Sequence, residues 1–179
     1  MKPKIKQLSI EDARYLRAAE GWLELGDAAS ATSELEQIKP VERTHPAVLQ
    51  VRYGIHAKCG HWDRAAEMAE QIASALPDEA GSWINLAYAT RRKTGGGIPA
   101  AKTILLAAEP IFSQECIIPF NLACYCSQLR EFEQAQQWLR KAAAINDKAV
   151  RKLAAEDEDL KPLWESKGKM IWGEDNPLR

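Results

Sequence analysis

Residues 116–145 read CIIPFNLACYCSQLREFEQAQQWLRKAAAI and predict two helices joined by a tight turn. Apolar side chains recur every three or four residues before the turn and again after it, which is the spacing of one face of an α-helix. Phe120, Ala123 and Leu129 form this face on the first helix, and Ala135 and Leu139 belong to it on the second. Because apolar faces are buried against each other, the stretch predicts an antiparallel helix pair.

The same arrangement occurs three times upstream. Each copy has a turn residue followed by an alanine: Gly26 and Ala31, Gly60 and Ala65, Gly95 or Gly96 and Ala100 or Ala101, with Arg130 and Ala135 in the last copy. The steps between these alanines are 34, then 35 or 36, then 35 or 34 residues. One helix pair per unit at this period resembles the tetratricopeptide repeat (TPR). The resemblance covers about residues 12–145 and implies an all-α, right-handed α-solenoid of antiparallel helix pairs.

The resemblance implies a single helical-repeat domain over residues 1–179. Its four repeats are expected at about residues 12–45, 46–79, 80–115 and 116–147, with capping helices at about 148–172 and a tail at 173–179. A cap is needed because the last repeat of such an array would otherwise expose an apolar face. Leu160, Leu163, Trp164 and Ile171 are predicted to supply it.

Two local departures from the repeat pattern are visible. Tyr53 stands where the family has a small residue that lets two helices approach, and Gly54 follows it, which predicts a shift of that contact by one position. The third turn is lengthened to contain Gly95, Gly96 and Gly97, and three glycines cost backbone entropy when they are ordered. This turn is predicted to be the loosest point of the array.

The whole-chain composition excludes some classes of partner. The 179 residues are 46% hydrophobic and 27% charged, and the formal net charge is -1, which gives no general attraction to nucleic acid or to an acidic membrane. No apolar run is long enough to span a bilayer, and the first residues, MKPKIKQLSIEDA, lack the apolar core of a signal peptide. We therefore expect a cytoplasmic protein with free cysteine thiols, since no two of its four cysteines form a CxxC pair.

No group of residues with catalytic chemistry stands out in the sequence. No serine, cysteine or lysine has a base at recognisable spacing, and His45, His56 and His61 lack further ligands at metal-site spacing. The string GGIPAAKT at residues 96–103 is similar to the phosphate-binding loop GxxxxGK[ST], but Ala101 replaces the second glycine and Pro99 removes a backbone amide. We expect no enzyme activity, no metal and no cofactor. A nucleotide-binding or enzymatic domain that uses the turn from Gly95 to Thr103 is an alternative.

The resemblance implies that the first helices of successive repeats line a concave groove that binds a peptide. Asn85 and Asn121 stand at equivalent positions, each in the string NLA, where an amide could both donate to and accept from a peptide backbone. Nearby aromatic rings could cover apolar side chains, and arginines could pair with carboxylates. The predicted peptide-binding residues are Asn85, Tyr88, Arg91, Arg92, Phe120, Asn121, Leu16 and Gln50.

Charge is unevenly distributed along the chain. Residues 80–108 carry a formal charge of +4 and residues 10–45 a charge of -4, which predicts a polarised groove and a partner segment of acidic character. The two-carboxylate clamp of some chaperone-binding TPR proteins is absent, because the matching positions hold Leu16, Glu20, Val51, Gly81 and Asn85.

Two kinds of binding function fit this sequence. The main hypothesis is a non-catalytic protein-protein interaction scaffold that binds a peptide or helical segment of a partner. The alternative is a bacterial secretion-type chaperone that shields an apolar client segment. Its client would contact Leu16, Ile84, Tyr88, Ile117 and Phe120.

Overall fold

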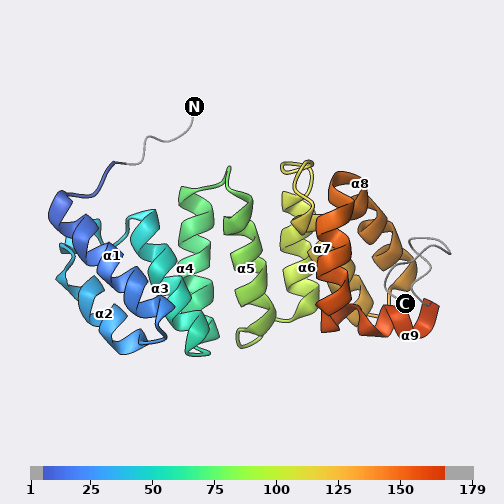
Figure 1. Ribbon diagram of the computed structural model, residues 1–179, viewed down its shortest axis with the longest axis horizontal. Coiled ribbons are helices and arrows are strands. Elements are labelled where there is room, and N and C mark those ends of the chain that lie inside the picture. The colour runs from blue at the N-terminus through green and yellow to red at the C-terminus, as the bar shows by residue number, and fades with distance from the viewer. Residues whose placement is uncertain (1–5, 168–179) are drawn as a thin grey trace. The chain divides into compact units, whose positions relative to one another are not determined.

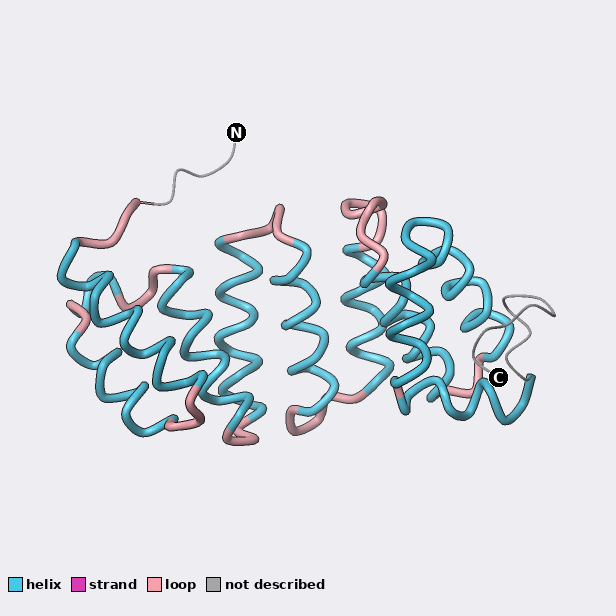
Figure 2. The backbone as a smooth tube through the Cα atoms, viewed as in Figure 1, coloured by secondary structure: helices cyan, strands magenta, loops and turns pink. Residues whose placement is uncertain are grey.

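The computed structural model describes residues 6–167, and within this range the chain consists of helices and turns with no strand (Figures 1 and 2). Contacts between Cα atoms divide the chain into two compact units, one ending at Gly96 and the other beginning at Gly97. The division falls in the glycine-rich turn of the predicted third repeat. The predicted single-domain organisation and the repeat bounds stay predictions.

The first unit holds two complete helix pairs and one further helix. α1 packs against α2 and α3 packs against α4, so helices that follow each other in sequence also lie against each other in space. α5 lies against α4. The elements are α1 (Ile10–Glu24), α2 (Ala28–Gln37), the 3₁₀ turn η1 (Pro40–Glu42), α3 (Pro46–Lys58), α4 (Trp62–Ala75) and α5 (Ala80–Arg92).

The second unit is built around α7, which packs against α6, α8, η2 and α9. The predicted capping residues Leu160 and Leu163 are fully buried, and Trp164 packs against the same core cluster. Ile171 lies outside the described residues. The elements are α6 (Ile98–Ala108), α7 (Ile117–Gln128), α8 (Phe132–Glu156), η2 (Glu158–Leu160) and α9 (Lys161–Lys167).

The repeated alanines are buried where helices pack against one another. Ala31, Ala65 and Ala135 have no exposed surface, and neither has Ala101, whereas its neighbour Ala100 is exposed. Small side chains at these positions let the helix backbones come together. The register of the third repeat, which the sequence left open between two alanines, is therefore set by Ala101.

The start of α1 is fixed by a reciprocal cap. The Ser9 hydroxyl accepts from the Asp12 backbone N–H at 3.1 Å and donates to the Asp12 carboxylate at 2.7 Å, which in turn accepts from the Lys39 N–H at 3.0 Å. The hydrogen bond from Ser9, followed by that from Lys39, lowers the pKa of Asp12 below its usual value. A buried carboxylate thus joins the first turn of α1 to the end of the first helix pair.

Gly54 lies at the contact between α1 and α3. A Cβ atom at Gly54 would lie 2.8 Å from Cδ2 of Leu23, so α1 approaches α3 at this glycine. Tyr53 instead packs beside Ala65 and Ala66 of α4. Gly54 therefore faces the preceding pair, whereas the predicted shift concerned the contact between α3 and α4.

Turns between paired helices use a left-handed residue in both units. Gly26 and Gly60 have φ angles of 90° and 73°, and Arg130, which follows α7, has φ of 61°. A non-glycine residue in this region carries a steric cost.

α8 has a local break at Asn146, whose backbone is non-helical. The Asn146 side-chain oxygen accepts from the Ala149 N–H at 3.1 Å. The break lies where the sequence predicted the end of the fourth repeat and the start of the cap.

Candidate protein-binding surface

The predicted site residues of the first unit lie on α3 and α5, except for Leu16, which lies on α1. Gln50 of α3 is exposed, and on α5 Tyr88 is 43% exposed while Asn85 and Arg92 are half-buried. Tyr53, one turn after Gln50, directs its hydroxyl to the Asn85 carbonyl oxygen at 3.4 Å. This hydrogen bond links α3 to α5, which both pack against α4. Arg91 is also half-buried on α5.

Two aromatic rings and an arginine form a stack at the C-terminal end of α5. The ring centroids of Trp62 and Tyr88 are 5.6 Å apart and meet edge to face at 68°. The guanidinium carbon of Arg92 lies 3.5 Å from the Tyr88 centroid and 5.3 Å from the Trp62 ring, and Nη1 donates to the Tyr88 carbonyl at 3.1 Å. Such contacts between a cation and ring faces are attractive and hold the guanidinium in one orientation. We call these three residues the Arg92 stack.

The segment after α5 is tied back to α4. Asp63 accepts from the backbone N–H of Thr94 at 3.0 Å and from its hydroxyl at 2.9 Å, and Lys93 reaches Glu70 at 3.4 Å. A Cβ at Gly96 would lie 1.9 Å from the Thr90 carbonyl oxygen, so only glycine fits there. These contacts keep the end of α5, and with it the Arg92 stack, fixed against α4.

The two equivalent asparagines have different hydrogen bonds. The Asn121 amide donates to the Ile117 carbonyl of its own helix at 2.9 Å. Within residues 6–167 the Asn85 amide makes no hydrogen bond, and only its backbone carbonyl receives the Tyr53 hydroxyl. Because an amide has two N–H donors and an acceptor oxygen, Asn85 offers its full capacity to a ligand, whereas Asn121 has already used one N–H.

Two of the predicted peptide-binding residues belong to the hydrophobic core instead. Leu16 is 7% exposed and packs in a cluster with Leu35 and Val51, and Phe120 is 2% exposed and packs with Leu139. Neither side chain presents a surface that a ligand could cover. Helical periodicity identified both as apolar but did not distinguish a groove-lining side chain from one that faces the next helix.

The lysine of the phosphate-loop-like string is engaged inside the second unit. Lys102 forms a short hydrogen-bonded ion pair with Glu131 and lies 3.4 Å from the Gln134 side-chain oxygen. Burial alone would lower the pKa of Lys102, but the bonds to Glu131 and to the Cys126 thiol raise it above its usual value, and the Lys102 bond lowers the pKa of Glu131. The lysine is thus a structural cation that bridges α6 and the start of α8.

All four cysteines are free thiols, as predicted. Cys124 and Cys126 are buried, Cys116 is half-buried and Cys59 is exposed. Burial raises the pKa of Cys126 to about 11, although Lys102 acts in the opposite direction. The Cys126 thiol is therefore protonated at neutral pH, the form that is not a nucleophile.

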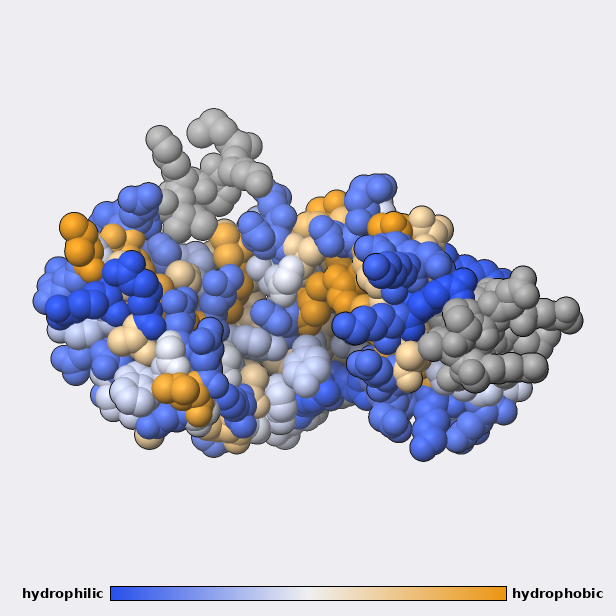
Figure 3. Space-filling model, viewed as in Figure 1, coloured by the Kyte–Doolittle hydropathy of each residue, from blue (hydrophilic) through white to orange (hydrophobic). Residues whose placement is uncertain are grey.

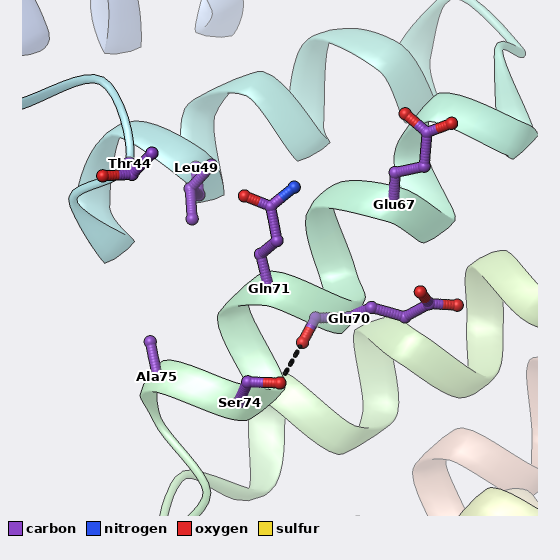
Figure 4. A pocket seen from close by; sticks show the side chains of 7 residues that line it. All are labelled: Thr44, Leu49, Glu67, Glu70, Gln71, Ser74 and Ala75. Atoms are coloured by element: carbon purple, nitrogen blue, oxygen red, sulfur yellow. Dashed lines mark hydrogen bonds between the residues drawn. The ribbon is translucent and has the colours of Figure 1, made fainter. Parts of the chain in front are cut away.

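A surface hollow of about 680 Å³ lies on the first unit between α4 and the beginning of α3 (Figure 4). Its carboxylates already have cations, because Glu67 pairs with Arg64 at 3.0 Å and Glu70 with Lys93 at 3.4 Å. The Ser74 hydroxyl donates to the Glu70 carbonyl at 2.9 Å. The residues that line the hollow include no aromatic side chain to orient a ligand, so it is less suited to recognition than the α5 surface. It is lined by Thr44, Leu49, Glu67, Glu70, Gln71, Ser74 and Ala75.

The histidines do not form a metal centre with other ligands. The His56 and His61 rings are 6.1 Å apart, and among the described residues no group of three or more His, Cys, Asp or Glu side chains is placed to hold a metal ion. Burial lowers the pKa of His56, and the neighbouring His61, Arg52 and Arg64 lower it further. In residues 6–167, no helix is sufficiently long and apolar for a membrane span.

The face of the molecule drawn in Figure 3 is largely hydrophilic, with hydrophobic residues gathered in separate patches. Among the large apolar side chains on α5, Tyr88 is the one that is exposed. Trp62 was not among the predicted site residues. The signal that could have identified it is its position at the start of the second helix of a pair. In an antiparallel array, this end lies beside the C-terminal end of the first helix of the next pair.

Fold and surface together define an all-α protein of the helical-repeat class. The fold is TPR-like: the chain is similar to TTC0263, a thermophilic TPR protein of Thermus thermophilus, with a TM-score of 0.64 and 20% sequence identity over 89% of this chain and 93% of that one. It is also similar to TPR-like repeats of a putative kinesin light chain from Podosopora anserina, in a form with one substituted residue (TM-score 0.65, 16% identity, 89% and 91% covered) and in a second structure (0.64, 17%, 88% and 90%). No family model and no curated protein sequence matches the chain. The fold class predicted from the sequence is confirmed.

Proposed function

We propose that this chain is a protein-interaction scaffold without chemistry of its own, and that it binds a segment of a partner protein on the surface formed by α3 and α5. The TPR-like fold supports a protein partner. The observation that carries the proposed location is the Asn85 amide, which is half-buried yet makes no hydrogen bond among the described residues. It can pair with the backbone of an extended segment, since one amide both donates and accepts.

The charge near this surface supports a partner segment of acidic character. Residues 80–108 contain four basic residues and no acidic one. Two of the four, Lys93 and Lys102, are paired with Glu70 and Glu131, whereas Arg92 at the end of α5 packs on aromatic rings and offers its charge to a ligand. A location in the cytoplasm and the absence of a nucleic-acid or membrane partner stay predictions.

The alternative function, a secretion-type chaperone that shields an apolar client segment, has less support. Of the five apolar residues expected to contact its client, Leu16 and Phe120 lie in the core. The nucleotide-binding alternative has less support for a similar reason, because Lys102 is bound to Glu131.

A peptide library displayed on phage tests the proposal while the partner itself is unidentified. We expect the wild-type chain to enrich specific peptides, and a variant with Gln50→Ala and Asn85→Ala to lose most of its affinity for them. Asn121→Ala is the matched control, because it removes the same amide from the same NLA string where that amide is used within its own helix. Selected peptides that bind the double variant as tightly as the wild type would move the binding surface elsewhere.

A further inference from the structure

We propose that the Arg92 stack is a carboxylate receptor, and that the segment it binds carries an aspartate or glutamate next to an apolar or aromatic side chain. This inference rests on the proposed protein-binding function and specifies the chemistry of the bound segment. It adds Trp62 of α4 to the binding surface as the residue that positions Arg92.

The guanidinium of Arg92 has N–H donors that no described acceptor uses. A guanidinium carries five N–H donors, and the Nη1 contact with the Tyr88 carbonyl uses one of them. No carboxylate of the described residues lies within 4.0 Å of Arg92, in contrast to Lys141, which meets Glu109 at 2.6 Å, and Arg151, which meets Asp147 at 2.7 Å. Arg92 is thus a fixed positive charge whose neighbours in the first unit are rings rather than anions.

The rings prepare Arg92 for a planar anion. Packing on Tyr88 at 3.5 Å and near Trp62 at 5.3 Å takes water from a face of the guanidinium while its edge keeps N–H groups available. A side chain already held in one orientation loses less entropy on binding, and a partly desolvated cation forms stronger charge-assisted hydrogen bonds than one in water. A carboxylate, which accepts two parallel N–H bonds, matches this edge.

The exposed part of Tyr88 determines what stands beside the carboxylate. The residue is 43% exposed although Arg92 lies over its ring. An aromatic or aliphatic side chain of the ligand could cover this remaining apolar surface, which is favourable for large rings in particular. The combination selects a segment with an acidic residue adjacent to an apolar one over a segment that is only acidic.

A second arginine on a tyrosine offers an internal comparison. The guanidinium carbon of Arg14 lies 5.2 Å from the Tyr15 centroid on α1, and Tyr15 is the one ring that the described residues place against it. Arg14 lines a hollow together with Glu11, in the part of the chain whose formal charge is -4. Arg14 therefore shares the residue types of the Arg92 stack but lacks its basic surroundings and its second ring.

Fluorescence anisotropy with three matched probes tests the inference. The first probe is a blocked, fluorescein-labelled peptide in which glutamates flank one phenylalanine, and the others replace every glutamate by glutamine or by lysine. We expect the wild-type chain to bind the glutamate peptide at least about tenfold more tightly than the glutamine peptide, and the lysine peptide least. Arg92→Gln and Tyr88→Leu should remove the preference for glutamate, Arg92→Lys should retain part of it, and Arg14→Gln should leave it unchanged.

An NMR measurement on the wild-type chain makes the test independent of how well the variants fold. The Arg92 side-chain Nε–H resonance, assigned by its absence in Arg92→Gln, should shift on titration with the glutamate peptide and stay in place with the lysine peptide. Equal affinity of the wild type for the glutamate and glutamine peptides, binding of neither of them, or a preference that survives Arg92→Gln would overturn the inference. In each of these cases the proposed function would still stand if the variant with Gln50→Ala and Asn85→Ala no longer bound the phage-selected peptides.

Discussion

α5 and α7 share the string NLA at the same place in their repeats, yet they differ in how much surface they offer. α7 has nine buried residues among its twelve, because α6, α8, η2 and α9 all pack against it. α5 has four buried residues among thirteen, and its Asn85, Tyr88 and Arg92 retain accessible surface. A repeat motif therefore sets the position of a residue within a helix pair. The elements around that pair decide whether the residue can meet a ligand.

The largest effect that separates the two helices should come from removing their aromatic side chains. Phe120→Ala, in the core of the second unit, should cost about 3 to 5 kcal/mol of unfolding free energy, because it leaves a cavity at a residue that is 2% exposed. Tyr88→Ala should cost roughly 1 kcal/mol, since a partly exposed ring leaves no enclosed cavity. Urea unfolding followed by circular dichroism measures both. Similar costs for the two variants would show that α5 is as tightly enclosed as α7.

A smaller effect should distinguish neighbouring alanines on α6. Ala101→Trp should destabilise the chain by about 1 to 3 kcal/mol or more, because overpacking strains a site with no exposed surface. Ala100→Trp is the matched control and should stay within about 0.5 kcal/mol of the wild type, since Ala100 is exposed. Thermal melts of the two variants decide the matter. The reverse order would mean that the third repeat follows the other register.

The pH dependence of stability should report on the first unit through His56. Its pKa is lowered in the folded chain, so the unfolded chain binds more protons as the pH falls below about 6.5. The stabilisation is complete above that pH and is lost as the pH falls toward the folded-state pKa. The lowered pKa values of Asp12, Asp27 and Glu131 act in the same direction, but below their usual values of 3.8, 3.8 and 4.5.

Urea midpoints at pH 5 and pH 7 measure this dependence. The wild type should be less stable at pH 5, and His56→Gln should reduce the difference between the two pH values, because glutamine does not titrate. A His56→Gln variant with the full pH difference of the wild type would assign the titration to other groups.

The smallest effect should appear at the turns. Arg130→Gly should stabilise the second unit by up to about 1 kcal/mol, because glycine adopts a φ of 61° without steric cost, although it also adds entropy to the unfolded chain. Gly60→Arg, at φ of 73° in the first unit, should change stability by a similar amount in the opposite direction. Differential scanning calorimetry of both variants is the measurement. A destabilised Arg130→Gly would indicate that the arginine side chain contributes contacts that outweigh its backbone cost.

Most of the fold was predictable because its determinants are local. Alternating helical faces, repeated alanines and the Ser9 cap each depend on residues within a few turns, and the structure confirms the helix pairs, the buried alanines and the leucines of the cap. The burial of Phe120 and Leu16, which we had predicted to contact a ligand, was not predictable in this way. Their burial depends on tertiary packing: Phe120 belongs to the cluster that also holds Leu160 and Leu163 from beyond α8, and no spacing rule within α7 contains that information.

The candidate site was predictable only in part. The α5 residues were identified because they lie on one face of a single helix, but Trp62 belongs to another helix and joins Tyr88 and Arg92 through packing of α5 on α4. The engagement of Lys102 by Glu131 also depends on packing between residues 29 positions apart. Contacts of this kind follow from the tertiary structure, which a single sequence does not display.

The unequal accessibility of the four thiols has a practical consequence for spectroscopy. A maleimide dye at neutral pH should react first with Cys59, which is exposed, while Cys126 is shielded both by burial and by a pKa of about 11. Cys59 stands three residues before Trp62, in the turn that leads into α4. Once Cys116 is replaced by serine, the chain therefore carries its own attachment point for a reporter dye next to the Arg92 stack, with no engineered cysteine.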